Sequence, residues 1–227
     1  MKFGTNLNAV RSAILSHAKS PEDVRREVAA RAPVITISRE AGANAPAIVE
    51  SLMHLLNQRQ PHAPWSLYDS ELVQRVAEDH DLAEHLVHAV EERDRSWIER
   101  FAAGLTGTPT DVEVAMKVAK TIRGVAAVGH AVIVGRGGQA ILRGLKHTTH
   151  VRLIAPEDWR AEQYAREAGL DAGKALAEVR RIDGERRRFV KHHFHQDPDD
   201  HWLYHLTLDV ARVKPERAAA AIAALVD

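Results

Sequence analysis

The stretch RAPVITISREAGANAPAIVE, residues 31–50, decides the fold. It opens with a β-branched run at residues 34–37, of the kind that fills a buried parallel strand. Turn formers follow, namely Gly42, Asn44 and Pro46. Apolar side chains then recur at helical spacing, at Ile48, Leu52, Leu55 and Leu56. Strand, small-residue turn and helix in this order present backbone N–H groups and a helix N-terminus to an anion such as phosphate.

Length and composition are those of an ordinary globular protein. The 227 residues suffice for one domain with a full core, or one domain with an appendage. Lys plus Arg equals Asp plus Glu, at 31 each, so we expect no nucleic-acid partner and no anionic membrane surface. The chain has no Cys, which excludes disulfides, thiolate metal sites and a Cys nucleophile. No apolar run approaches the roughly 18 residues of a membrane span, and no signal-peptide core is evident, so we expect a cytoplasmic protein.

Two regions differ in their patterns. Residues 1–31 carry weak helical patterns and predict an N-terminal helical extension without recognisable chemistry. Residues 32–227 predict a single domain without an internal boundary. Packing of the extension on a partner, or association of identical chains as a homo-oligomer, is compatible with the sequence.

The domain alternates predicted strands and helices. Apolar runs without alternation predict five strands, at residues 34–38, 65–68, 131–134, 151–155 and 206–210. Helical patterns lie between them, with a long amphipathic helix around residues 82–101 and a basic one at 172–193. Predicted helix starts are a cap at Ser70, a cap at Thr110 and Pro156 at the first helical position. The order predicts a three-layer α/β fold, an about five-stranded parallel sheet with helices on both faces.

Polar residues follow the predicted strands where ligands bind in open parallel sheets, beyond the carboxyl ends. These ends carry Ser38, Arg39 and Glu40, then Asp69, then Arg136 between glycines. Arg gives forked bonds to phosphate oxygens, and a carboxylate can bind ribose hydroxyls, hold magnesium or accept a proton. Surface ion pairs are the alternative reading of the same residues. Their convergence on one rim favours a site for a phosphorylated ligand.

Five segments in order resemble the cytidylate kinase-like proteins, P-loop relatives of the nucleoside monophosphate kinases. They are VITISREAGAN, LYDSELV, AVIVGRGGQAIL, VRLIAPEDWRAEQYARE and RRIDGERRRFVKHHF. The resemblance covers about residues 33–226 and leaves out the N-terminal extension. It implies a P-loop kinase sheet with residues 38–47 as the phosphate-binding loop.

The resemblance also implies an activity and a set of site residues. The reaction would be transfer of the ATP γ-phosphoryl group to a nucleoside monophosphate such as CMP, with Mg²⁺ bridging the phosphates. A mobile basic lid would carry the catalytic residues Arg160, Arg180, Asp183 and Arg186. The residues expected to bind nucleotide are Ser38, Arg39, Glu40, Gly42, Asn44, Asp69, Arg136 and Gly137.

The loop departs from a working Walker sequence, GxxxxGK[ST]. It keeps Gly42, has no Lys, and has no hydroxyl side chain after that glycine. Arg39 could replace the Lys, and Asn44 tolerates left-handed geometry. Pro46 removes one N–H that phosphate could use. We therefore expect weak ATP binding or none.

Three functional hypotheses remain open at this point. The first is a nucleoside phosphate kinase with an unusual loop. The second is a non-catalytic, pseudokinase-like regulatory or interaction protein that has lost phosphoryl transfer. The third is a phosphate-metabolite binder without kinase chemistry, which would share the site.

The basic helix and the histidines near it have simpler interpretations. Its cationic side chains suit a solvated face as well as a lid, and Gly184 would allow the lid to move. The histidines at 192, 193, 195, 201 and 205 match no standard zinc spacing, so we expect no metal site there.

Overall fold

The computed structural model describes residues 32–79, 92–105 and 108–226. It contains one sheet of five parallel strands, in the order β2-β3-β1-β4-β5. The strands are β1 (Val34–Arg39), β2 (Ser66–Tyr68), β3 (Ala131–Val134), β4 (Thr148–Ile154) and β5 (Leu206–Asp209). The predicted five-stranded parallel sheet is confirmed. The expected N-terminal extension lies outside the described residues.

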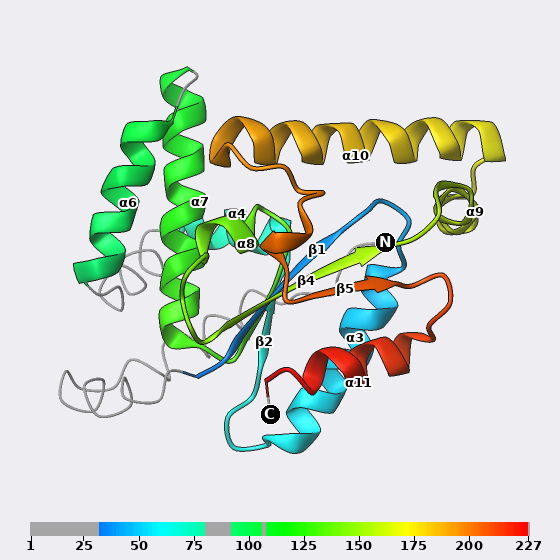
Figure 1. The fold of residues 1–227 in the computed structure, drawn as a ribbon, viewed down its shortest axis with the longest axis horizontal. Coiled ribbons are helices and arrows are strands. Elements are labelled where there is room, and N and C mark those ends of the chain that lie inside the picture. Colours follow the sequence, from blue (N-terminus) through cyan, green and yellow to red (C-terminus); the bar gives the residue numbers. More distant parts are fainter. Residues whose placement is uncertain (1–31, 80–91, 106–107, 227) are drawn as a thin grey trace.

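Helices cover both faces of this sheet (Figure 1). Helices α3 (Ala45–Arg59) and α11 (Pro215–Ala223) share one apolar cluster with β1 and β4. Helices α4 (Ser70–Glu78), α7 (Pro109–Val128) and α8 (Gly138–Ile141) form a second cluster with β1 and β3. Strand β1 is fully buried over residues 34–37, because it contributes side chains to both clusters. The three-layer architecture is therefore confirmed.

The remaining helices lie at the carboxyl edge and at one end of the sheet. Helix α9 (Glu157–Ala168) follows β4 and packs on α10 (Ala172–Phe194), which runs across the top of the view in Figure 1. Helix α6 (Glu92–Gly104) packs on α7. The longer helix predicted around residues 82–101 falls partly on residues outside those described. A short 3-10 turn, η2 (His201–Leu203), precedes β5. No helix in the described part of the chain is long and apolar enough to cross a membrane.

Three predicted helix starts were wrong by one or two residues. Asp69, not Ser70, caps α4, because its carboxylate accepts hydrogen bonds from the amides of residues 71 and 72. Helix α7 begins after Thr108, which forms a capping box with Asp111. Pro156 has extended backbone and precedes α9 as its N-cap.

Candidate functional site

The loop between β1 and α3 is wound around a small hollow. Gly42 and Asn44 both have left-handed backbone, with φ of 74° and 46°. This confirms the predicted tolerance of Asn44. The hollow, about 110 Å³, is lined by loop residues 39–46 and by side chains from α9 and α10, including Arg186. It is several times larger than the space one water needs, so a phosphate-sized group fits.

Gly42 is required for two reasons, its positive φ and the close approach of the α9 backbone. A Cβ atom at this position would overlap the backbone carbonyl of Arg160 in α9. The loop therefore lies directly against α9, and no other residue type allows the same contact.

A buried ion-pair network fixes the loop in this position. The amide of Ala41 donates to Asp183 Oδ1 at 2.7 Å, and Arg160 Nη1 donates to Asp183 Oδ2 at 2.6 Å. Arg160 also donates to the carbonyls of Ala41 and Ala155, and pairs with Glu40 at 3.2 Å. The side chain of Arg160 is 7% exposed. These contacts join the loop, the end of β4 and helix α10 into one unit, which we call the loop clip.

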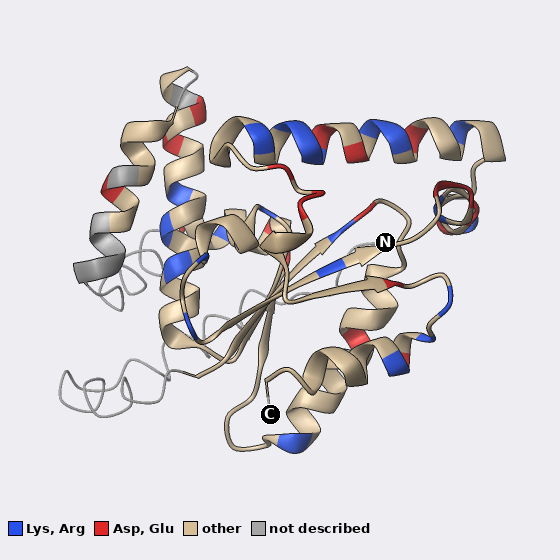
Figure 2. Ribbon diagram, in the orientation of Figure 1, with Lys and Arg blue, Asp and Glu red and all other residues tan. Residues whose placement is uncertain are grey.

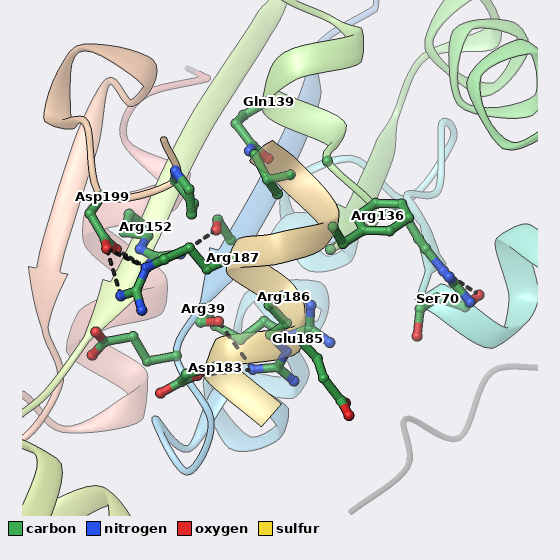
Figure 3. Close-up of a pocket in the computed structure, with 17 residues that line it drawn as sticks. Arg39, Ser70, Arg136, Gln139, Arg152, Asp183, Glu185, Arg186, Arg187 and Asp199 are labelled. Carbon is green, nitrogen blue, oxygen red and sulfur yellow. Dashed lines mark hydrogen bonds and ion pairs between the residues drawn. The ribbon is translucent and has the colours of Figure 1, made fainter. Parts of the chain in front are cut away.

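A larger cavity of about 410 Å³ lies between α10 and the carboxyl ends of β1 and β3 (Figure 3). Five guanidinium groups line it, and we call it the arginine cavity. They belong to Arg39, Arg136, Arg152, Arg186 and Arg187. Figure 2 shows charged residues along α10, which lies above charged residues at the strand ends. Glu40, Asp183, Glu185 and Asp199 also line the cavity.

The electrostatics of the cavity favour an anion. Burial, with a smaller contribution from Arg186, lowers the pKa of Arg39 to about 9. Burial also lowers the pKa of Arg136 and of Arg186. Since guanidinium groups stay protonated near neutral pH, these directions mean that the positive charges are poorly compensated. Asp69 offsets this only in part for Arg39, and burial is the sole cause for Arg136, so a bound oxyanion would compensate charges that burial leaves costly.

Arg136 is held in an uncommon backbone conformation. Its φ is 56°, and the glycines on both sides also have positive φ. Its guanidinium donates to the carbonyl of Ser70 at 3.3 Å and to Gln74 Oε1 at 3.1 Å. Gly135 has a φ of 84°, which favours glycine, and a Cβ there would displace the guanidinium of Arg39. The turn after β3 therefore positions two of the cavity's cations.

A model of the cytidylate kinase-like family matches residues 34–212. The chain belongs to the cytidylate kinase-like family. The crystal structure of an uncharacterized protein from Eubacterium ventriosum is similar in fold, with a TM-score of 0.68. It shares 22% sequence identity, and the match covers 86% of this chain and 98% of that one. No curated protein matches the chain significantly. Membership places this protein among the kinase-like, nucleotide-binding proteins.

The structure of this cytidylate kinase-like chain brings most of the predicted site residues together. The arginine cavity is lined by Ser38, Arg39, Glu40, Arg136, Gly137, Asp183 and Arg186, all on the predicted list. Gly42 and Asn44 line the hollow, together with Arg39, Glu40 and Arg186. Three predicted residues line neither space. Asp69 caps α4, Arg160 lies in the loop clip, and Arg180 is an exposed partner of Glu157 at 2.7 Å.

Of the cavity residues that were not among the predicted site residues, four bear on the chemistry of the site. Arg152 lies between the buried Val151 and Leu153 in β4, and a cation between two buried apolar residues is the signal that could have found it. Arg187 was counted only as part of a basic helix. Asp199 lies in the polar segment between α10 and η2. Gln139 is 4% exposed and lines the cavity, and among the described residues its Nε2 has no hydrogen-bond partner.

Proposed function

We propose that this protein is a nucleotide phosphotransferase, which moves the γ-phosphoryl group of ATP to a nucleoside monophosphate such as CMP. The donor phosphates would bind in the hollow of residues 39–46, and the acceptor in the arginine cavity. One observation carries the proposal. Arg39, Glu40 and Arg186 line both spaces, so the hollow and the cavity meet at two guanidinium groups.

This junction suits in-line phosphoryl transfer. A phosphate oxygen of the acceptor forms a bond to the γ-phosphorus while the bond to the β–γ bridging oxygen breaks and ADP leaves. The charge on the three equatorial oxygens would face Arg39 and Arg186, which stabilise it electrostatically. The loop clip would contribute by positioning other groups. Arg160 and Asp183 hold the loop after β1 against α10, and they need not contact the nucleotide themselves.

Magnesium would arrive with the nucleotide as MgATP. The loop offers no hydroxyl side chain between Gly42 and Ala47, where a Walker loop places its magnesium ligand. Among the described residues no group of three or more His, Asp or Glu could hold an ion. The side chains therefore do not fit a resident magnesium site, and we assign the ion to the substrate.

A second candidate is a non-catalytic, regulatory member of the family. It is favoured by the hydrogen bond from the Ala41 amide to Asp183 Oδ1. A loop amide that could bind phosphate is thereby committed to a carboxylate of the chain itself. The missing Lys and hydroxyl of the loop point in the same direction.

A coupled assay of ADP release with MgATP and each common nucleoside monophosphate separates the two candidates. The proposal expects turnover with at least one acceptor, and a loss of about 100-fold or more in Arg186→Ala. Arg181→Ala is the control, because Arg181 lies on the same helix but pairs with Glu178 and Glu185 away from the cavity. Absence of turnover with every acceptor would contradict the phosphotransferase and leave the regulatory candidate.

A further inference from the structure

Asp199 lies between two guanidinium groups of the arginine cavity (Figure 3). Its Oδ1 accepts a hydrogen bond from Arg152 Nη2 at 2.9 Å. Its Oδ2 accepts from Arg187 Nε at 3.0 Å and from Arg187 Nη2 at 2.7 Å. One carboxylate thus receives three charge-assisted bonds from two arginines, an arrangement that phosphate and carboxylate ligands also receive.

The two arginines differ in how they are held. Arg152 projects from β4, its side chain is only 11% exposed, and its Nη1 donates to Ser38 Oγ at 2.8 Å. Its position is therefore set by the sheet. Arg187 projects from α10 and is 47% exposed, and its contact to Asp199 raises its pKa. A nearly buried cation thus faces a half-exposed one, with the carboxylate between them.

Asp199 differs from the other carboxylates of the cavity wall. Glu40 and Asp183 are committed to the buried Arg160, and Glu185 pairs with Arg181 outside the cavity. Asp199 is 44% exposed and belongs to the short segment between α10 and η2. That segment is anchored by Tyr204, whose hydroxyl donates to the carbonyl of Pro198 at 2.9 Å. The Asp199 side chain can therefore leave the arginines without unfolding any helix or strand.

We propose that Arg152 and Arg187 form an oxyanion subsite of the arginine cavity, and that Asp199 is a built-in counter-ion which the ligand displaces. The ligand group is an oxyanion, phosphoryl or carboxylate, carried by the molecule that binds in this cavity. This inference rests on the proposed function in one respect, namely that the molecule bound in the cavity is a nucleotide. While Asp199 occupies the subsite, the apparent affinity for the ligand is reduced by the fraction of molecules in which the subsite is free. Asp199 therefore tunes affinity and rejects weakly charged competitors.

The test uses isothermal titration calorimetry with inorganic pyrophosphate, CMP and MgATP as separate probes. Asp199→Asn keeps the shape of the side chain and removes its charge. We expect it to bind pyrophosphate about ten-fold more tightly than the wild-type chain, with the gain falling as salt is added. In the double variant Asp199→Asn, Arg187→Gln the gain should disappear. Arg181→Gln, on the same helix but outside the cavity, should leave all affinities unchanged.

The outcomes separate this inference from the proposed function. If Asp199→Asn leaves pyrophosphate affinity unchanged or lowers it, or if neither chain binds pyrophosphate, the subsite does not exist. If pyrophosphate binds more tightly to the variant and no nucleotide binds to either chain, the subsite stands and the nucleotide function fails. If CMP or MgATP binds both chains equally and pyrophosphate does too, the nucleotide function stands and the counter-ion role of Asp199 is wrong. Circular dichroism and urea unfolding of each variant confirm that it is folded.

Discussion

Asp183 in α10 accepts a hydrogen bond from the amide of Ala41, at 2.7 Å, across 142 positions of the chain. The same carboxylate pairs with Arg160 at 2.6 Å. The loop after β1 and the helix that roofs the cavity are thus joined by one side chain. The position of the loop, and of any ligand that it binds, therefore depends on the contact between Asp183 and Ala41.

The first prediction concerns the stability of the loop clip. Asp183→Ala should lower the free energy of unfolding by about 3 kcal/mol, because it leaves the buried Arg160 with one carboxylate fewer. Urea unfolding measures the change. Glu178→Ala, which removes an exposed partner of Arg181 on the same helix, should leave the unfolding curve unchanged. Equal effects of the two variants would show that the clip is only a surface ion pair.

The second prediction separates close packing from backbone strain at Gly42. Gly42→Ala should lower the free energy of unfolding by about 3 kcal/mol, because the new Cβ meets the carbonyl of Arg160 at a positive φ. Gly169→Ala is the matched control, with φ of 65° and open space around the Cβ. It should show the smaller loss, of about 1 kcal/mol, that the left-handed conformation alone imposes. A similar loss in both variants would contradict the close contact between the loop and α9.

The third prediction is that replacing Arg39 increases stability and weakens ligand binding. Its charge is largely buried, its pKa is lowered to about 9, and the attraction of Asp69 offsets this only in part. Arg39→Met should therefore raise the free energy of unfolding by about 1 kcal/mol while weakening pyrophosphate binding by about ten-fold or more. Unfolding and calorimetry on the same samples test both parts. A loss of stability together with unchanged binding would place Arg39 among the structural residues.

How far the sequence determined the fold can be seen in its strands. β-branched runs without alternation identified β1 and β3, because strands buried on both faces contain little else. The strand order β2-β3-β1-β4-β5 was not predictable, since pairing depends on which helices pack on which face. Helix starts such as that at Asp69 were missed because Asp and Ser cap equally well in sequence.

From position along the chain alone, the site was predictable only where a residue follows a strand directly, whereas Asp183 and Arg186 came from the family resemblance. Arg39 and Arg136 were found because the carboxyl ends of parallel strands meet at one edge. Arg152 and Asp199 were missed, because their meeting depends on how the segment after α10 returns to the sheet. Arg160 and Arg180 were carried over from the resemblance as catalytic. Their contacts place one in a buried network and the other on an exposed surface.

The fourth prediction is a pH dependence of stability at His150. Burial, with a smaller contribution from His205, lowers the pKa of His150 from 6.5 to about 4. Between these values the unfolded chain takes up a proton that the folded chain does not. The free energy of unfolding should therefore be unaffected by this group above pH 6.5 and fall as the pH drops towards 4, by about 3 kcal/mol in total.

Urea unfolding of the wild-type chain and of His150→Gln across this pH range tests the assignment. The variant should show a shallower dependence, because Gln cannot take up the proton, while it can still hydrogen-bond to Thr36 Oγ1. Identical pH profiles for the two chains would contradict a buried neutral histidine at this position.

The central claim is that the arginine cavity and the loop hollow together bind a nucleotide. Its most direct test is a calorimetric titration of the wild-type chain with CMP and with MgATP, beside the variant Arg39→Met, which alters both spaces at once. We predict saturable heat with at least one nucleotide, and a loss of at least about ten-fold in affinity in the variant. No heat with any nucleotide at millimolar concentration, or equal affinity in both chains, would contradict the claim.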